Sequence, residues 1–300
     1  MAERKPVGIV GLGLMGEVFA RRLIDAGFAV LGFDIDSQKA TGLGAIGGRP
    51  VSTIDELARA CHPIVLAVFN TEQVEAVVET ALLPALRGSD TVVVCTSTCD
   101  PDRIAALGAR AAAAGLRFLE APVSGTSDQV RRGDGVGLIG GDAQMAAEIG
   151  GVLDVLFPQR FHVGAVGDGG RTKLAVNLIL GLNRLALAEG LVFASRLGLD
   201  PEAFLRVARA SAAYSQVMDT KGAKMVQSDF APEGRARQTL KDVHLMLDQA
   251  RRIGQDLPLL EVNAAVLESC VRHGEADCDN SVVIAEIRRR ARPSSEKQPP

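Results

Sequence analysis

Aromatic residues are scarce in this 300-residue chain, which has no Trp and a single Tyr. Proteins that bind single-stranded nucleic acid stack bases on such side chains, so this mode of binding is not available here. Lys and Arg together number 33 and Asp and Glu 36, which gives a net charge of −3. This balance gives no reason to expect a nucleic acid or an anionic membrane as a partner.

Cysteine pairs and histidine clusters are also missing. The five cysteines are odd in number, none belongs to a C-x-x-C pair, and the four histidines stand singly. Because the ligand spacing of zinc sites is absent, we expect no metal site. Unpaired thiols of this kind are typical of small buried side chains in a reducing compartment, so we expect a cytoplasmic protein.

Neither a secretion signal nor a membrane span is expected. The first residues, "MAERKPVGIVGLGLMG", have a charged start, then a strand and a glycine turn, with no small-residue cleavage site. The apolar stretch from Leu174 to Ala194 is long, but polar residues interrupt it, namely Asn177, Asn183, Arg184 and Glu189. A spanning helix tolerates such residues poorly, so we expect a helix buried in a protein core.

The first half of the chain alternates between apolar, β-rich runs and helical stretches. The runs are Val7–Val10, Ala29–Phe33, Ile64–Val68, Thr91–Cys95 and Phe118–Ala121. This alternation predicts an α/β domain over residues 1–166, with parallel βαβ units in a doubly wound, Rossmann-type sheet. Only helical segments follow, which predicts an all-α domain over residues 167–291 that begins with a long interdomain helix. The polar, Pro-rich residues 292–300 are predicted to be a disordered tail.

A glycine motif follows the first strand and opens a helix. In such a G-x-G-x-x-G motif the glycines permit a tight turn, a close approach of the backbone to a pyrophosphate, and close helix packing. Asp34 ends the second strand, where an acid binds the ribose diol of the cofactor. The candidate cofactor-binding residues are Asp34 and the loop Gly11, Leu12, Gly13, Leu14, Met15 and Gly16. The Asp34 carboxylate would repel a 2′-phosphate, so NAD is favoured and NADP stays possible.

One lysine stands at the head of the apolar run. Lys173 and Asn177 are spaced i, i+4, so they share one helix face. With a helix that begins near Thr172, Lys173 lies in the first turn, where the helix dipole disfavours a cation. Burial and the dipole both favour the neutral amine, which suits proton exchange near neutral pH. The spacing alone leaves open a surface lysine that extends its amine to solvent.

A short polar stretch follows the fifth predicted strand, within "EAPVSGT". Ser124, Gly125 and Thr126 lie at the carboxyl edge of the sheet, where open α/β sheets bind ligands. Hydroxyl groups and backbone N–H groups at such a turn suit a substrate carboxylate. A plain turn between a strand and a loop is the alternative.

Together these motifs resemble those of the β-hydroxyacid dehydrogenase family, in the 6-phosphogluconate dehydrogenase superfamily. The family includes 3-hydroxyisobutyrate dehydrogenases and tartronate semialdehyde reductases. "GLGLMG", "APVSGT" and "GGRTKLAVN" stand at its cofactor, substrate and catalytic motifs, and Thr126 departs from the usual glycine. The resemblance runs from about Val7 to Arg290 and implies that Lys173 and Asn177 are catalytic.

Further site residues are implied by the resemblance alone. They are Lys241 in "LKDVHLML", Ser97 and Thr98 in "TSTCDP", and Asn70 in "VFN", all expected at the cofactor. Tyr214 and Ser215 are candidates for the substrate pocket. Arg184, two turns beyond the catalytic residues, could line the substrate pocket or a subunit interface, and the interface is favoured.

The resemblance implies an oxidoreductase that transfers a hydride between NAD and the hydroxyl carbon of a small hydroxy acid. The substrate would resemble 3-hydroxyisobutyrate, tartronate semialdehyde or threonate, with Lys173 as general acid and base. A homodimer or homotetramer with contacts between helical domains is also implied. Two alternatives stay open, namely an imine or other carbonyl reductase on the same fold and a non-catalytic NAD-binding protein.

Overall fold

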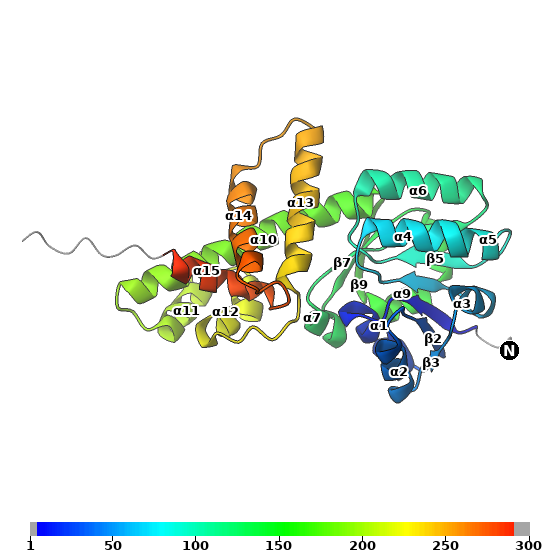
Figure 1. The fold of residues 1–300 in the computed structure, drawn as a ribbon, viewed down its shortest axis with the longest axis horizontal. Coiled ribbons are helices and arrows are strands. Elements are labelled where there is room, and N and C mark those ends of the chain that lie inside the picture. The colour runs from blue at the N-terminus through cyan, green and yellow to red at the C-terminus, as the bar shows by residue number, and fades with distance from the viewer. Residues whose placement is uncertain (1–4, 291–300) are drawn as a thin grey trace, which may run out of the picture. The chain divides into compact units, whose positions relative to one another are not determined.

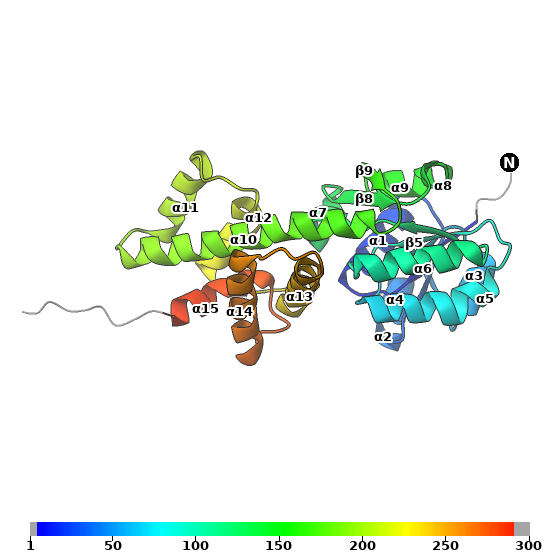
Figure 2. The ribbon, with the colours of Figure 1, turned by 90° about the horizontal axis from the view of Figure 1, so that it is seen from above.

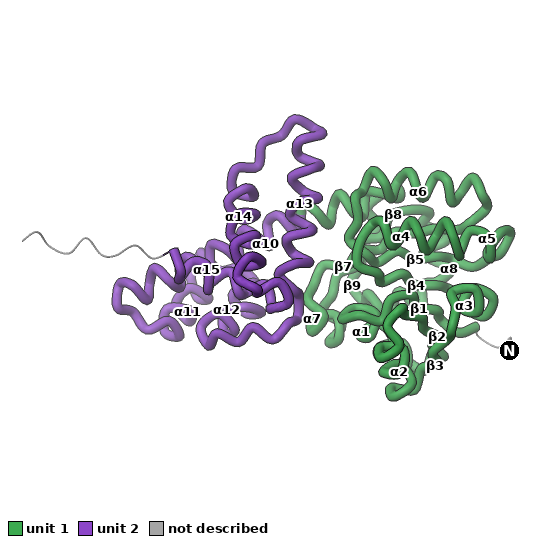
Figure 3. The backbone as a smooth tube through the Cα atoms, viewed as in Figure 1, with its two compact units in different colours: residues 1–175 green, residues 176–300 purple. Residues whose placement is uncertain are grey.

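The computed structural model describes residues 5–290, so the predicted tail at 292–300 lies outside the described residues. The chain forms two compact units, residues 1–175 and 176–300, which Figure 3 colours separately. The division lies beyond the predicted boundary at residues 166 and 167. It falls within one long helix, α10 (Asp168–Arg196).

Within the described residues of unit 1, nine strands form one sheet in the order β3-β2-β1-β4-β5-β6-β8-β7, with β9 beside β8. The strands that the sequence predicts are all present and mutually parallel, which confirms the Rossmann-type α/β fold. They are β1 (Val7–Val10), β2 (Val30–Phe33), β4 (Ile64–Leu66), β5 (Val92–Cys95) and β6 (Arg117–Glu120).

The sequence missed four further strands, β3 (Arg49–Pro50), β7 (Val123–Ser124), β8 (Val136–Gly140) and β9 (Gln159–Gly164). β8 runs antiparallel to both β6 and β7, whereas β8 and β9 are parallel, so the sheet departs from the predicted parallel pairing only where β8 meets β6 and β7. Two of the missed strands have only two residues each. The glycines of β8 resemble a turn in the sequence, which is why its run of small and apolar residues was not recognised.

Helices cover both faces of the sheet, as alternation along β5 shows. Val92 and Val94 pack with the core of one face, whereas Val93 and Cys95 pack with that of the other. α1 (Leu14–Asp25) and α9 (Gly150–Leu156) cover the first face, and α3 (Ile54–Ala60), α4 (Thr71–Val77) and α6 (Pro101–Ala113) cover the second. Figures 1 and 2 show α4 and α6 side by side on one side of the sheet.

Several helices begin where the sequence places a cap. Oδ1 of Asp100 accepts hydrogen bonds from the N–H groups of Asp102 and Arg103 ahead of α6. An acid before a helix satisfies amide groups that have no partner within the helix. The remaining helical segments of unit 1 are α2 (Ser37–Ala45), η1 (Val78–Leu82), α5 (Leu83–Ala85), α7 (Ser127–Arg132) and α8 (Ala143–Glu148).

The described part of unit 2 contains helices and no strand, which confirms the predicted all-α domain. After α10 come α11 (Pro201–Ala210), α12 (Val217–Gln227), α13 (Ala236–Arg252), α14 (Pro258–Arg272), η2 (Asn280–Val282) and α15 (Val283–Arg289). α12 was not predicted, because polar residues and a glycine separate its few large apolar residues. Tyr214 lies just before it and is half exposed, and its hydroxyl donates to Oδ2 of Asp219 at 2.7 Å.

By length and composition alone, α10 could cross a membrane. Its most apolar 18-residue window has a mean hydropathy of 1.5, and 39% of that window is buried inside the structure. The core helix of a soluble protein passes the same test, so one such helix is weak support for a membrane span. That the protein has no membrane partner stays a prediction.

Candidate active site

The predicted cofactor residues of unit 1 collect at one edge of the sheet. The parallel strands β1, β2, β4 and β5 all end there, and β1 lies between β2 and β4. The chain therefore leaves β1 toward β2 and later returns to β4 on the opposite side of β1. Ligands of open α/β sheets bind in the crevice outside such a reversal point.

The glycine loop after β1 has the geometry that a dinucleotide requires. Gly11 has a φ of +93°, and a Cβ there would lie 2.7 Å from the carbonyl oxygen of Ala67. At Gly16 a Cβ would lie 1.9 Å from the carbonyl oxygen of Gly11, so this position permits the helix to approach the loop. At Gly13 a Cβ would meet no atom within 4 Å, which leaves that face of the loop open.

The open face leads to the start of α1. Gly13 precedes this helix and provides no side-chain cap for its first amide groups. Helix amide groups without a side-chain acceptor, at the positive end of the helix dipole, form a ready site for phosphate oxygens. The loop and the helix start therefore fit the pyrophosphate of NAD or NADP.

Asp34 is tied to this loop by two backbone hydrogen bonds. Its Oδ2 accepts from the N–H of Leu12 at 2.7 Å, and its Oδ1 accepts from that of Asp36 at 2.9 Å. The Nζ of Lys39 lies 3.7 Å from Oδ1 of Asp34, so a cation partly offsets the acid. Lys39 lies on α2, and 44% of its side chain is exposed.

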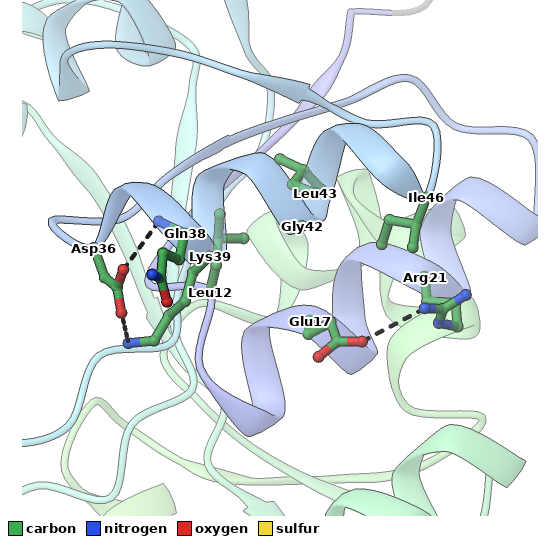
Figure 4. A pocket seen from close by; sticks show the side chains of 9 residues that line it. All are labelled: Leu12, Glu17, Arg21, Asp36, Gln38, Lys39, Gly42, Leu43 and Ile46. Carbon is green, nitrogen blue, oxygen red and sulfur yellow. Dashed lines mark hydrogen bonds and ion pairs between the residues drawn. The ribbon is translucent and has the colours of Figure 1, made fainter.

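A pocket of about 390 Å³ adjoins the loop. Figure 4 shows charged side chains from two elements around it, with Glu17 and Arg21 on α1 and Asp36 and Lys39 at the start of α2. Its lining consists of Leu12, Glu17, Arg21, Asp36, Gln38, Lys39, Gly42, Leu43 and Ile46. Because Leu12 both lines the pocket and binds Asp34, this pocket suits the adenosine end of the cofactor.

The loops after β4 and β5 hold the other predicted cofactor residues of unit 1. Oδ1 of Asn70 accepts from the N–H of Gln73 at 2.9 Å and so caps α4. The Ser97 hydroxyl donates to the carbonyl oxygen of Val68 at 2.7 Å, which joins the two loops. These bonds give both side chains a structural role at the crevice. Direct contacts of Asn70, Ser97 and Thr98 with the cofactor stay predictions.

Thr126, one of the three residues of the predicted carboxylate site, also caps a helix. The hydroxyl oxygen of Thr126 accepts from the N–H of Gln129 at 3.2 Å, and the N–H of Thr126 donates to Oε1 of Gln129 at 2.9 Å. This reciprocal capping box begins α7 and occupies the N–H of Thr126, whereas the hydroxyl hydrogen of Thr126 can still donate to a substrate. The T-x-x-Q spacing was visible in the sequence. Ser124 is half-buried at the end of β7, and substrate binding by Ser124, Gly125 and Thr126 stays a prediction.

Lys173 is buried, with 6% of its surface exposed. The alternative of a lysine that extends to solvent is therefore wrong. Its place in the first turn is also wrong, because α10 begins at Asp168 rather than near Thr172. Since the dipole effect falls off after the first turn, the structure supports the burial of this lysine but not the expected effect of the helix dipole.

Asn177 lies one turn after Lys173 on the same helix and contacts Asp242, in the segment "LKDVHLML". Its Nδ2 donates to Oδ2 of Asp242 at 3.2 Å. The Nζ of Lys241 lies 3.1 Å from Oδ1 of the same carboxylate. Sequence reasoning identified Lys241 but assigned no role to Asp242, because nothing in the spacing indicates that it binds Asn177.

Arg184 lies further along α10 and is buried within unit 2, with 6% of its surface exposed. Burial lowers the pKa of its guanidinium to about 10, and the carboxylate of Asp279 opposes this shift. The expectation that Arg184 lies at a subunit interface is therefore wrong.

Two family descriptions match this chain in succession. Residues 6–164 match the NAD binding domain of 6-phosphogluconate dehydrogenase, and residues 167–287 match the NAD-binding domain of NADP-dependent 3-hydroxyisobutyrate dehydrogenase. The chain belongs to the β-hydroxyacid dehydrogenase family. Members are oxidoreductases that use NAD(P), and the glycine loop of this β-hydroxyacid dehydrogenase fits that cofactor.

Individual relatives agree with this assignment. An L-threonate dehydrogenase from Cupriavidus necator is 30% identical over 93% of this chain and 94% of its own length. A 2-(hydroxymethyl)glutarate dehydrogenase from Eubacterium barkeri is 30% identical over 95% of each chain. A crystal structure of 3-hydroxyisobutyrate dehydrogenase from Salmonella typhimurium has a TM-score of 0.85 at 27% identity, over 94% of this chain and 99% of that one. This β-hydroxyacid dehydrogenase is accordingly an NAD(P)-dependent enzyme that acts on CH–OH groups.

Proposed function

We propose that this enzyme catalyses the reversible oxidation of the hydroxyl carbon of a small hydroxy acid, with Lys173 as general acid and base. The observation that carries the proposal is the burial of Lys173, one turn before Asn177 on α10. NAD, when bound, accepts the hydride from the hydroxyl carbon. In the same direction the Lys173 amine accepts the hydroxyl proton, and in reduction it returns that proton to the carbonyl oxygen.

Ser124, at the end of β7, and Gly125 bind the carboxylate of the substrate in this proposal. The Ser124 hydroxyl and nearby backbone N–H groups can donate to a carboxylate, and hydrogen bonds to a charged group are among the stronger ones in proteins. Relatives are named for threonate and for 2-(hydroxymethyl)glutarate. A hydroxy acid like these, or like 3-hydroxyisobutyrate or tartronate semialdehyde, is the proposed substrate class.

Asn177 supports the reacting groups. Because its Nδ2 donates to Asp242, its Oδ1 is the atom that can accept a hydrogen bond from an amine or a substrate hydroxyl. Lys241 in turn neutralises Asp242. We infer that Lys241 has this positioning role in addition to its predicted contact with the cofactor.

NAD is the preferred cofactor in this proposal, and NADP is the weaker one. The Asp34 carboxylate lies at the end of β2, where it would repel a 2′-phosphate. Lys39 at 3.7 Å offsets part of that charge, so NADP is disfavoured and not excluded.

A homodimer or homotetramer in the cytoplasm completes the proposal. Unit 2 exposes several large apolar side chains on α10 and α11 and in the segment between them, namely Ile179, Phe193, Leu197, Leu199 and Val207. Apolar side chains of this size are typical of surfaces that another subunit covers. Light scattering coupled to size exclusion measures the mass of the assembly, and a monomer at micromolar concentration would contradict this part.

An activity screen tests the central proposal. The purified enzyme is supplied with NAD or NADP and a set of three- and four-carbon hydroxy acids, and formation of the reduced cofactor is followed by absorbance. The corresponding alcohols, which lack the carboxylate, and a set of cyclic imines with NADPH serve as controls. Turnover of an acid but not of its alcohol supports the proposal, whereas turnover of imines alone would replace it.

A further inference from the structure

Glu120 is a buried acid that the proposed reaction does not use. It ends β6, has 1% of its surface exposed, and lies beside Cys95 of β5 in the register of the sheet. Its Oε2 accepts a hydrogen bond from the N–H of Gly167 at 2.8 Å. The N–H groups of Gly169 and Gly170 also donate to this carboxylate.

Glycines surround the carboxylate at distances that a side chain would not permit. A Cβ on Gly169 would lie 2.9 Å from Oε2 of Glu120, and one on Gly170 would lie 2.8 Å from Oε1. A Cβ on Gly140 of β8 would lie 3.1 Å from Oε2. Because the glycines before Lys173 have no side chains, the start of α10 can lie close to this buried acid.

The first amide groups of a helix have no partner within the helix. Here Glu120 provides their acceptor, although it lies far from α10 in the sequence. Lys173 follows Gly169 by four residues and Gly170 by three, so it lies on the same helix face, one turn further along. Whatever fixes these two glycines also fixes the position from which the lysine side chain extends.

We propose that Glu120 is a positioning residue for Lys173, whose ionised carboxylate holds the first turn of α10 and thereby orients the amine. This inference rests on the proposed function, in which that amine exchanges a proton with the substrate. Glu120 itself touches no reacting atom in this scheme.

The surroundings of Glu120 make its charge sensitive to pH. Burial raises the pKa of Glu120 to about 7, and the glycine N–H groups and Arg171 oppose this rise. Arg171 is itself shared with Asp102 and Asp168. On the adjoining strand, a hydrogen bond with Cys99, together with burial, raises the pKa of Cys95, so that thiol stays neutral.

Asp100 caps α6 and precedes Pro101, which lies close to Gly170. An ionised carboxylate accepts hydrogen bonds at both oxygens, whereas a protonated one carries a hydrogen that opposes the N–H donors. The hydrogen bonds between Glu120 and the first turn of α10 should therefore weaken as pH falls through neutrality.

Nuclear magnetic resonance of the full-length enzyme tests this contact without any substrate. The amide resonances of Gly167, Gly169 and Gly170 should shift together as pH is varied, with one midpoint near pH 7. In Glu120→Gln this common titration should vanish. Amide shifts that do not titrate in the wild type would overturn the inference. Because this titration is measured on the wild-type enzyme, it tests the inference even if the variant does not fold.

Kinetics with a verified substrate test the consequence. Glu120→Gln should lower kcat by about 10- to 100-fold, the order that a small misplacement of a catalytic group causes. It should also remove the inflection near pH 7 from the pH profile of kcat and leave the dissociation constant of NADH unchanged. Glu202→Gln, at an exposed position on α11, is the matched control and should behave as the wild type.

A comparison with Lys173→Ala distinguishes a wrong role for Glu120 from a wrong proposed function. If Lys173→Ala is inactive while Glu120→Gln keeps the wild-type kcat and pH profile, the role of Glu120 is wrong and the proposed function stands. If Lys173→Ala keeps normal turnover, the proposed function fails, and with it the part of the inference that concerns the lysine.

Discussion

The side-chain amide of Asn177 donates a hydrogen bond of 3.2 Å to Oδ2 of Asp242. Lys241 lies 3.1 Å from the other oxygen of that carboxylate. Two motifs separated by 65 positions in the sequence are thus joined side chain to side chain. Because the amide N–H donates to Asp242, its oxygen can accept a hydrogen bond from an amine or a hydroxyl, which suits a residue one turn from the proposed general acid and base, Lys173.

Lys173→Ala should lower kcat by about 10²–10⁴, the usual contribution of a general acid and base. The affinity for NADH, measured by fluorescence titration, should change little. Lys173→Arg should not restore activity, because a guanidinium stays protonated and cannot exchange a proton near neutral pH. Near-normal turnover of Lys173→Ala on a verified substrate would refute the mechanism.

Asn177 and Asp242 should behave as one unit. Asn177→Ala and Asp242→Ala should each lower kcat, by an amount that corresponds to about 1.5–3 kcal/mol for a hydrogen bond to a charged group. The double variant should lose about as much as the worse single variant, because both substitutions remove the same contact. Additive losses in this double-mutant cycle would show that the two residues act independently.

Cofactor preference should respond in opposite directions at two neighbouring positions. Asp34→Ala should raise kcat/KM for NADP relative to NAD, since it removes the acid that opposes the 2′-phosphate. Lys39→Gln should raise the preference for NAD severalfold, the effect expected of a partly exposed charge pair. A wild-type enzyme that works better with NADP would contradict the role given to Asp34.

Substitution of Ser124 should affect substrate binding, whereas substitution of Thr126 should affect stability. Ser124→Ala should raise KM for the hydroxy acid by about 10- to 150-fold, equivalent to the loss of about 1.5–3 kcal/mol from a charged hydrogen bond. Thr126→Ala should leave KM nearly unchanged and lower the free energy of unfolding by about 0.5–2 kcal/mol, because it removes the cap of α7. An unchanged KM in Ser124→Ala would place the carboxylate site elsewhere.

The sequence predicted those features that depend on local patterns and missed those that depend on distant contacts. Strand, turn and helix signals stand next to one another in the sequence. They therefore revealed the glycine loop, the following acid and the helix that carries Lys173. β8 was missed because its glycines serve partners far along the chain. A Cβ on Gly137 would lie 2.7 Å from Phe157, and one on Gly140 would lie 2.6 Å from the carbonyl oxygen of Ala165.

The site shows the same division between local and distant information. Motif spacing and the family resemblance indicated Lys173, but its burial depends on elements that pack around it in the folded chain. No spacing rule could place Lys39 beside Asp34 or Glu120 at the start of α10. Each of these contacts depends on a side-chain direction or on a strand order that hydrophobic periodicity does not specify.

Stability should also depend on pH through Glu120. Its pKa in the folded enzyme, about 7, is above the ordinary value of 4.5, so the folded state binds the proton more tightly than the unfolded state. The resulting stabilisation is fully present below pH 4.5 and is lost as pH rises through 7, a change of about 3 kcal/mol. Chemical denaturation at a series of pH values should show this decline in the wild type but not in Glu120→Gln, and parallel curves would contradict it.

Gly170→Ala tests the close approach of Glu120 from the opposite side of the contact. Alanine within a helix normally stabilises it by about 1 kcal/mol relative to glycine. Here the new Cβ would lie 2.8 Å from Oε1 of Glu120, a side chain too buried to move aside without cost. Gly170→Ala should therefore lower both the melting temperature and kcat.

Gly190→Ala is the matched control on the same helix. A Cβ there would meet its nearest neighbour, the ring of Phe204, only at 3.8 Å, an ordinary contact distance. This substitution should raise the melting temperature or leave it unchanged, with normal kcat. The two variants should thus change stability in opposite directions because only one position faces a buried carboxylate. If Gly170→Ala were as stable and active as Gly190→Ala, the start of α10 would not depend on Glu120, and the orientation of Lys173 would need another cause.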